Sequence, residues 1–220
     1  MDLYEVMRTT FAARSFEPDP IPDDVLFRIL DHARYAGSGG NRQGWRVISV
    51  RDPLARNHIC ASMAPAFRRY VAQSAAGEQP WNTIEPTKLS ETEIAETVLP
   101  PGFLESIANA PTLLLVLCDL RLVASIDSEL DRVGIISGAS IYPFAWNILL
   151  AARSEGYGGT LTTFVTHEEA ALRDYFGFPD SVAACALLPM GKPTRQLTKL
   201  SRNPVSEFAW LDRWQGEPLG

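Results

Sequence analysis

The amino-acid sequence predicts an α+β fold in which helices cover a central sheet. Two continuous apolar runs, residues 112–118 and 181–193, are typical of strands that are buried on both faces. A third run, residues 45–51, is rich in β-branched residues and also favours a strand. No glycine-rich phosphate loop joins any of these strands to a helix. A layered α+β domain is therefore favoured over a doubly wound dinucleotide-binding sheet.

Two helices are expected before the first strand. Residues 2–10 and 25–35 both repeat apolar residues at helical spacing. Prolines keep the stretch between them extended, and Asp23 is placed to cap the second helix. That helix should end where a run of glycines begins at Gly37.

The chain after the first strand divides into a helix and an irregular stretch. The helix is expected over residues 54–74. Residues 75–106 then mix prolines and glycines with one polar helical piece, LSETEIAETV. We expect this excursion to run over the surface, where it could serve as a lid.

An apolar helix is expected within residues 128–154, after the first buried strand. The overlapping stretch SGASIYPFAWNILLAARSEGYG, residues 137–158, is apolar around nearly the whole helical circumference. Such a helix cannot face water, so we expect it in a core or against a second chain. Pro143 inside it should produce a kink or a local break.

The remaining elements continue the alternation of strands and helices. The segment GGTLTTF, residues 158–164, predicts a strand, and a helix capped by Thr166 and stopped by Gly177 should follow. After the second buried run, a tail from about residue 194 carries two tryptophans and is expected to pack rather than float free. Without repeats or low-complexity blocks, residues 1–220 are expected to form a single domain.

Composition and charge argue against several classes of function. The chain has 220 residues and a net charge of −6, with no stripe of Lys and Arg, so no nucleic-acid partner is expected. The N-terminus does not resemble a signal peptide, and no run approaches the roughly 20 apolar residues of a membrane span. We expect a cytoplasmic protein. The cysteines and histidines are scattered without ligand spacing, so neither a disulfide nor a metal site is expected.

The loop over residues 38–44 is the first candidate site. Ser38, Asn41 and Gln43 offer hydroxyl and amide groups, and Gly39 lets a ligand lie against bare backbone. Side-chain amides suit a neutral heteroaromatic edge that alternates donors and acceptors, such as the uracil-like ring of a flavin. In the alternative interpretation this is a helix end followed by a turn, and the amides only satisfy the loop.

Two arginines and one strand-like segment form a second group of candidates. Arg14 and Arg202 lie in non-helical stretches and could each bind a phosphate as a bidentate fork, although a solvated surface charge explains each one alone. The segment GYGGTLTTF could aim a backbone N–H at a flavin ring nitrogen. We find no nucleophile elbow, Cys–His pair or acidic dyad, which indicates that a cofactor would carry the reactivity of an enzyme.

Three segments taken together resemble the FMN-dependent nitroreductase family: SGGNRQGWRVISVRDP, SGASIYPFAWNILLAARSEGYGGTLTTF and SRNPVSEFAWLDRW. The similarity runs from about Arg14 to Trp214 and is weakest in residues 75–106. It implies an α+β fold with a central mixed or antiparallel sheet flanked by helices. It also implies a homodimer with two FMN sites at the interface, and a long buried helix around residues 141–150 that packs against its twin.

The resemblance further implies roles for single residues. The loop residues Ser38, Gly39, Asn41 and Gln43 are expected to contact the flavin, partly from the neighbouring subunit. Leu161, Thr162 and Thr163 are expected along the ring, where a backbone amide approaches the flavin N5. Arg14 and Arg202 are expected to hold the phosphate. The family pattern Arg-Arg-Ser-x-Arg is reduced to its last arginine, because Thr10 to Ala13 stand at the other positions. A charge-assisted contact is worth about 1.5–3 kcal/mol, so this loss should weaken FMN binding roughly tenfold unless another group compensates.

The leading functional hypothesis is an FMN-dependent oxidoreductase. NAD(P)H would reduce the flavin, and a nitroaromatic, quinone or related electron-poor acceptor would then replace it in a ping-pong mechanism. No catalytic side chain is expected, because the flavin carries the chemistry. One alternative is a non-catalytic dimer that sequesters or senses flavin, and another is an ene-reductase, dehydrogenase or dehalogenase. Trp81, Phe103 and Trp210 could shape the acceptor side, although ordinary packing also explains them.

Overall fold

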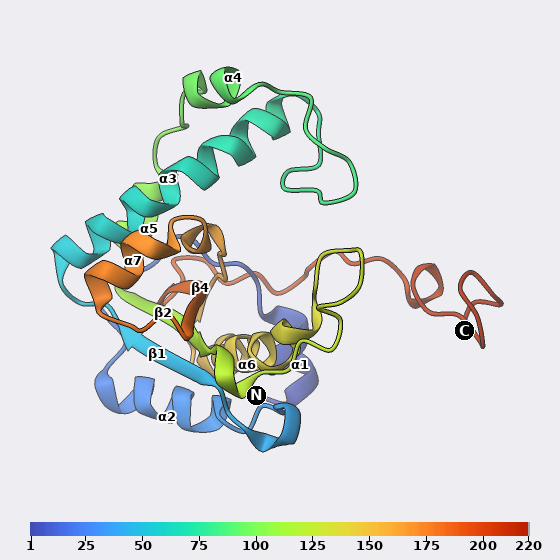
Figure 1. Ribbon diagram of the computed structural model, residues 1–220. Helices are drawn as coiled ribbons and strands as arrows, with labels where there is room; N and C mark the ends of the chain where they lie inside the picture. Colours follow the sequence, from blue (N-terminus) through green and yellow to red (C-terminus); the bar gives the residue numbers. More distant parts are fainter. Residues whose placement is uncertain (220) are drawn as a thin grey trace.

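The computed structural model describes residues 1–219 and contains a four-stranded antiparallel sheet between two layers of helices (Figure 1). The strands, in the spatial order β1-β2-β4-β3, are β1 (Trp45–Ser49), β2 (Thr112–Asp119), β4 (Val182–Gly191) and β3 (Gly158–Gly159). Every pairing in the sheet is antiparallel. The predicted α+β class with a central sheet is confirmed.

The helices divide between the two faces of the sheet (Figure 1). They are α1 (Leu3–Thr9), α2 (Asp23–Ala33), α3 (Pro53–Ala75), α4 (Glu91–Glu96), α5 (Phe103–Ala108), α6 (Tyr142–Ser154) and α7 (Glu169–Phe176). Helices α2 and α6 pack together on one face, and α3, α5 and α7 cover the other. Asp23 lies in the first turn of α2 instead of capping it, because Pro22 takes the capping position.

The core is organised by β2, in which every side chain is buried. Leu114 and Val116 enter the cluster beneath α2 and α6, whereas Leu113 and Leu115 enter the cluster beneath α3 and α7. This alternation follows from the strand period of two, and it requires apolar cover on both faces. The two predicted buried strands are thus confirmed as β2 and β4.

The expected apolar helix is shorter than its sequence pattern indicates. Residues 128–135 are irregular, a 3-10 turn covers Ile136–Ser140, and α6 begins only at Tyr142. Pro143 therefore sits in the first turn, where its missing N–H removes no helical hydrogen bond. Of the two predicted outcomes, the kink does not occur, and a break lies just before the proline, between the 3-10 turn and α6. Helix α6 is also not buried all round, since Trp146 is 45% exposed.

The predicted strand over residues 158–164 is interrupted. Formal strand β3 ends at Gly159, and Thr162 then forms an isolated bridge to Leu187. The reason is Pro189, which accepts a hydrogen bond from the Thr160 N–H but has no N–H to return. The next α-helix begins at Glu169 rather than after Thr166, and a left-handed Gly177 ends it as expected.

Two segments extend beyond the layered body (Figure 1). The excursion between α3 and α5 carries α4, and a capping box between Ser90 and Glu93 explains why the polar segment there forms a helix. The tail leaves the body after about residue 194, and its two tryptophans, Trp210 and Trp214, pack on each other at 4.9 Å. Trp214 stays 78% exposed, so the expected packing of the tail on the body is not seen within one chain.

Within residues 1–219, no helix combines the length and the apolar character that crossing a membrane requires. The same residues contain no group of three His, Cys, Asp or Glu side chains close enough to share a metal ion. The cysteines are all free.

Candidate functional site

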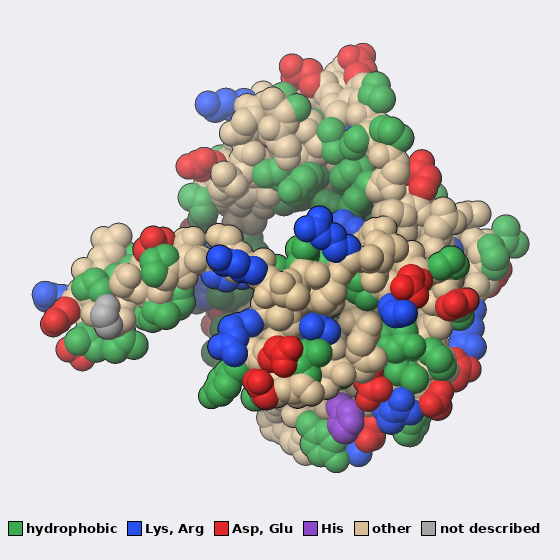
Figure 2. Space-filling view, turned by 180° about the vertical axis from the view of Figure 1, so that it is seen from behind, with side chains coloured by type: hydrophobic (Ala, Val, Ile, Leu, Met, Phe, Trp, Pro, Cys, Tyr) green, Lys and Arg blue, Asp and Glu red, His purple; other side chains and the backbone are tan. Residues whose placement is uncertain are grey.

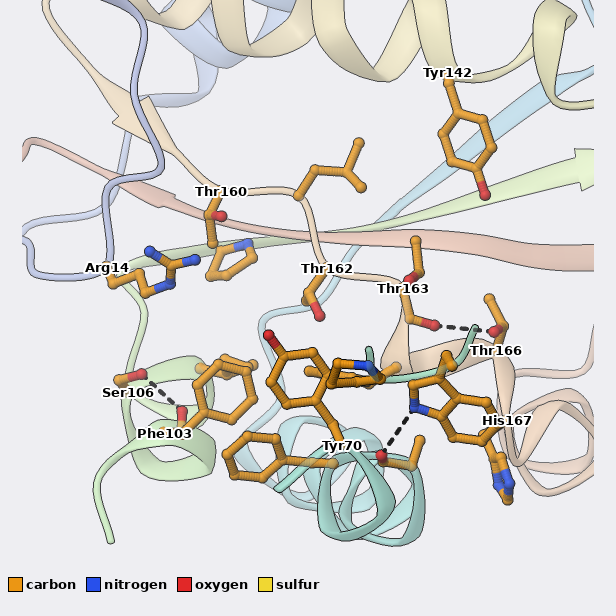
Figure 3. Close-up of a pocket in the computed structure, with 18 of the residues that line it drawn as sticks. Arg14, Tyr70, Phe103, Ser106, Tyr142, Thr160, Thr162, Thr163, Thr166 and His167 are labelled. Atoms are coloured by element: carbon orange, nitrogen blue, oxygen red, sulfur yellow. Dashed lines mark hydrogen bonds between the residues drawn. The ribbon is translucent and has the colours of Figure 1, made fainter. Parts of the chain in front are cut away.

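A cavity of about 980 Å³ opens between the second half of α3, the excursion and residues 160–167 (Figure 3). The space-filling view shows the surface hollowed between the excursion and the body (Figure 2). Small-molecule sites usually enclose about 300–1,000 Å³, so this cavity lies at the large end of that range.

One wall of the cavity is aromatic. Phe67 of α3 stacks on Phe103 with ring centroids 4.1 Å apart, and Phe164 contacts both rings edge-on or tilted. Tyr70 meets Phe164 edge-on at 5.5 Å. This wall presents flat apolar surfaces to whatever the cavity binds.

The opposite wall is an extended edge over residues 160–163. Thr162 and Leu187 exchange two backbone hydrogen bonds, of 3.0 and 2.8 Å. Because successive backbone groups in an extended chain point to opposite sides, the N–H groups of Leu161 and Thr163 face away from β4. Neither N–H has an acceptor among residues 1–219. Both residues line the cavity, which therefore has two unused backbone donors along its edge.

Arg14 stands at one end of the cavity (Figure 3). The chain is held there because Ala12 bridges to Gly159 and the Ala13 N–H donates to the Gly159 carbonyl at 3.0 Å. Within residues 1–219, the guanidinium makes no ion pair and only one long hydrogen bond, 3.4 Å to the Ala12 carbonyl. Its donors are available to an anion.

The excursion is tied to α3 by specific polar contacts. The side-chain carbonyl of Gln73, a buried residue, accepts the Trp81 N–H at 3.0 Å. Glu78 accepts from the Lys88 N–H at 2.8 Å and from the Thr87 hydroxyl at 2.6 Å. These contacts place Trp81 on the rim of the cavity, with Arg69 over its ring at 4.8 Å.

Much of this aromatic wall is not evident from the sequence. Phe67, Tyr70 and Phe164 were not predicted as site residues, whereas Trp81 and Phe103 were noted and do line the cavity. A usable signal existed, since the spacing of Phe67 and Tyr70 puts them on one face of α3. Nothing in the sequence showed that this face turns toward the edge at residues 160–163.

The glycine-rich loop is held in a strained backbone conformation. Its 3-10 turn covers Gly39–Asn41, and φ is positive at Gly40, Asn41 and Gln43, at 61°, 53° and 52°. Two of these residues carry side chains, for which this region costs free energy, and such residues gather at functional sites. The Ser38 hydroxyl accepts the Gln43 N–H at 3.0 Å and so fixes the turn.

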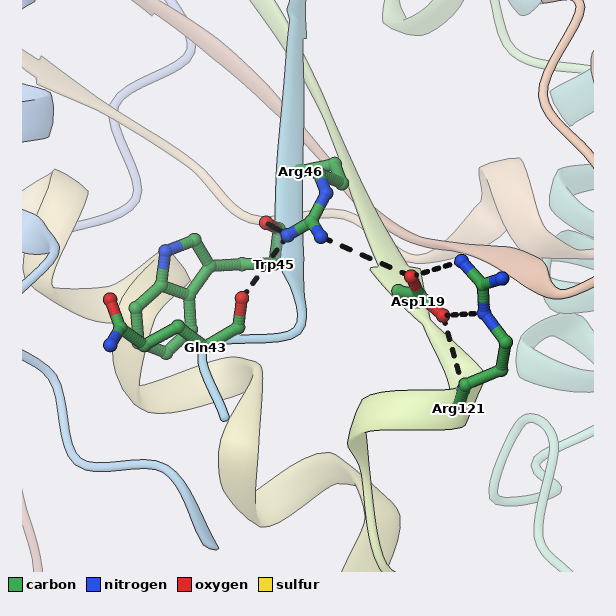
Figure 4. A network of polar contacts seen from close by, with 5 residues as sticks. All are labelled: Gln43, Trp45, Arg46, Asp119 and Arg121. Carbon is green, nitrogen blue, oxygen red and sulfur yellow. Dashed lines mark hydrogen bonds and ion pairs between the residues drawn. The ribbon is translucent and has the colours of Figure 1, made fainter. Parts of the chain in front are cut away.

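A charged network fastens this loop to the sheet (Figure 4). Arg46 donates to the Gln43 carbonyl at 3.1 Å and lies 3.9 Å from the Asp119 carboxylate. Arg121 forks onto the same carboxylate at 2.9 and 2.8 Å. These arginines, chiefly the hydrogen-bonded Arg121, lower the pKa of Asp119 to about 2. Next to Arg46 in the sequence, Trp45 stacks on Phe144 with ring centroids 4.7 Å apart.

Only some of the predicted site residues come together in one chain. Arg14, Leu161, Thr162 and Thr163 line the cavity. The loop residues Ser38, Gly39, Asn41 and Gln43 lie instead beside the start of α6, where the Gly39 N–H donates to Ser140 at 3.1 Å. Arg202 lies in the exposed tail and donates to the neighbouring Ser201 carbonyl. The roles of all nine residues stay predictions.

Asp119→Asn should change how stability depends on pH. The folded-state pKa of Asp119 lies near 2, below the ordinary value of 3.8, so its contribution is complete above about pH 4 and is lost as pH falls toward about 2. We expect the variant to be less stable at neutral pH and to lose less stability across that acid window. Urea unfolding at a series of pH values measures both effects. Asp131→Asn, at an exposed carboxylate, is the control, and equal acid sensitivity in all three proteins would contradict the assignment.

Sequence comparison places the chain among known proteins. The model of the Nitroreductase family matches residues 7–192. A 5,6-dimethylbenzimidazole synthase from Rhodobacter capsulatus is 39% identical over 77 residues, which span 35% of this chain and 37% of the synthase. A protein named NADH dehydrogenase from Thermus thermophilus is 27% identical over 193 residues, 87% of each chain.

Comparison with solved structures agrees on the fold. The NADPH:FMN oxidoreductase from Vibrio harveyi, solved in complex with NAD⁺, superposes with a TM-score of 0.69 at 18% identity. The superposition covers 97% of this chain and 78% of the Vibrio protein. Because the family model matches most of the length, this chain belongs to the nitroreductase family.

Proposed function

We propose that this chain is an FMN-dependent oxidoreductase that uses NAD(P)H to reduce a flat, electron-poor acceptor such as a nitroaromatic compound or a quinone. The observation that carries the proposal is the pair of unused backbone donors, Leu161 and Thr163, along the edge of an aromatic-lined cavity. Membership in the nitroreductase family supports a flavin, and the Vibrio harveyi structure belongs to an enzyme named for FMN and NADPH.

The residues present fit FMN. The cavity of about 980 Å³ is large enough for a flavin mononucleotide and offers a flat aromatic surface to its ring. Arg14 at one end matches a phosphate group, and the free N–H groups at residues 161 and 163 match ring atoms that accept hydrogen bonds. FMN, when bound, supplies the redox chemistry by accepting a hydride from NAD(P)H and passing the electrons to the acceptor.

The chain itself supplies position, charge stabilisation and shielding from water. Backbone N–H groups that are already fixed by the Thr162–Leu187 pair would stabilise negative charge on a bound ring, in the manner of an oxyanion hole. The rings of Phe67, Phe103 and Phe164 would keep water from that ring. If donor and acceptor both bind over the ring in this cavity, they would use it in turn, which is a ping-pong scheme.

We propose that a second copy of the chain completes the site. The loop over residues 38–43 is rich in amides and its turn is closed by the Ser38–Gln43 hydrogen bond, yet it does not line the cavity of its own chain. Six apolar side chains between residues 126 and 146 stay exposed; they are Ile126, Leu130, Val133, Ile135, Tyr142 and Trp146. A homodimer that covers this surface would bring each loop toward the cavity of its partner.

Binding and bleaching of the cofactor test the proposed function directly. The purified protein with FMN should be yellow, should bleach anaerobically with NADH or NADPH, and should regain colour when menadione is added. Absorption spectroscopy follows each step. Saturation with FMN without bleaching by either nicotinamide would instead support a protein that sequesters or senses flavin. Recovery of colour with enones or haloaromatics but not with quinones or nitroaromatics would point to the ene-reductase or dehalogenase alternative.

Arg14→Ala should weaken FMN binding about tenfold or more, because a charge-assisted phosphate contact is lost. Titration of flavin fluorescence measures the dissociation constant. Arg51→Ala is the matched control, since Arg51 is exposed and pairs with Asp23 away from the cavity. Arg202→Ala belongs in the same series, and an unchanged FMN affinity would remove its phosphate role.

Trp146→Glu should convert a dimer to a monomer and lower FMN occupancy at the same time, because the half-exposed face of α6 would no longer accept an apolar partner surface. Ile141 is a poorer choice, since it is only 2% exposed and belongs to the core. Light scattering coupled to gel filtration gives the mass. The control is Val98→Glu, on the excursion. A monomeric wild-type protein that binds FMN fully would contradict the shared site.

A further inference from the structure

The aromatic side of the cavity has few polar groups left to offer a ligand. The Ser106 hydroxyl donates to the Phe103 carbonyl at 2.7 Å, and the Trp81 indole N–H donates to the Ala66 carbonyl at 3.4 Å. On the other side of the cavity, the Tyr142 hydroxyl from α6 donates to the Cys185 carbonyl at 3.4 Å. Each of these donors is already engaged within the protein.

Tyr70 is the exception on this side. Its hydroxyl has no hydrogen-bond partner among residues 1–219, and the residue is 42% exposed. Figure 3 shows the hydroxyl pointing from α3 across the cavity, toward the edge that carries Thr160 and Thr162. The edge-on contact with Phe164, at 5.5 Å and 74°, supports the ring in this direction. A phenol that crosses an apolar wall and ends in open cavity is available to a bound molecule.

The charge of the groups around the cavity indicates which kind of acceptor the Tyr70 hydroxyl would bind. Arg14, the unpaired cation of the cavity, lies at one end, whereas Arg69 is held over the Trp81 ring. The His167 ring is paired with Glu168 at 3.0 Å. The Tyr70 hydroxyl, which lies across the cavity from residues 160–163, is therefore a neutral donor surrounded by aromatic side chains. A neutral donor suits an uncharged acceptor oxygen on the rim of a flat ring, such as a carbonyl or nitro oxygen.

We propose that Tyr70 is a ligand-binding residue that donates a hydrogen bond to an oxygen on the rim of the flat ring bound in this cavity. That oxygen belongs either to the pyrimidine part of the flavin or to the carbonyl or nitro group of the electron acceptor. The proposal rests on the proposed function, since it assigns one more contact within the same site.

The first experiment compares Tyr70→Phe with the wild type for FMN. The change deletes one oxygen and keeps the ring, so circular dichroism and thermal unfolding should be unaltered. If the flavin supplies the oxygen, the FMN dissociation constant rises about threefold to tenfold, the loss expected for one neutral hydrogen bond. Tyr175→Phe is the matched control, because Tyr175 is 45% exposed and stacks on His58 outside the cavity.

The second experiment uses redox-inert probes of similar shape, acetophenone and isopropylbenzene, with calorimetry on the purified protein with and without FMN. If the acceptor supplies the oxygen, the wild type prefers the ketone about threefold to tenfold, and Tyr70→Phe abolishes that preference. With menadione as acceptor, KM should rise in the same variant while kcat changes little, because binding rather than chemistry is altered.

Either change, alone or together with the other, supports the proposal and identifies the source of the oxygen. The proposal is overturned if the Tyr70→Phe variant is folded and has the same FMN affinity, ketone preference and KM as Tyr175→Phe. The ketone titration does not need turnover. Two results together would separate the proposals. If NAD(P)H never bleaches the wild type, the proposed function is refuted. If the wild type still prefers the ketone and Tyr70→Phe does not, the binding role of Tyr70 stands.

Discussion

The buried antiparallel pair of β2 and β4 is the constraint on which the rest of the molecule depends. Side chains of β2 are buried on both faces, so helices must cover the sheet from two sides. The same pair fixes Leu187 of β4, and Leu187 fixes Thr162 through two backbone hydrogen bonds. The position of the candidate site is therefore a direct result of core packing.

A single proline separates the structural part of this sheet from its open edge. Pro189 cannot return a hydrogen bond to Thr160, so the pairing that begins at Gly158 and Gly159 becomes discontinuous there. Residues 160–162 continue past β3 without belonging to a full ladder, and the outward N–H groups of Leu161 and Thr163 have no neighbouring strand. An edge of this kind would invite association with another strand, but here a cavity wall faces it.

Much of the fold could be predicted from the sequence, because apolar periodicity reports directly on burial. Strands β2 and β4 and helix α2 follow that rule. It failed at α6, where the apolar residues before Tyr142 form a 3-10 turn instead of an α-helix, and where an apolar face remains uncovered in the single chain. Of the candidate site, Arg14 and the segment that contains residues 161–163 are candidates from residue type alone, and the family resemblance then implies a role for each. The aromatic wall was not predicted, because only the tertiary fold brings Phe67 and Tyr70 opposite Phe164.

The excursion between α3 and α5 has its own internal support. Gln73 and Glu78 hold its backbone through contacts that involve neither β2 nor β4. Its anchoring is thus independent of the sheet, although it supplies part of the cavity rim. A segment with this arrangement behaves as an exchangeable module. Its length and sequence can diverge, or the segment can be replaced by grafting, while the sheet and its covering helices keep their geometry. Selection for new ligands could act on this module at little cost to folding.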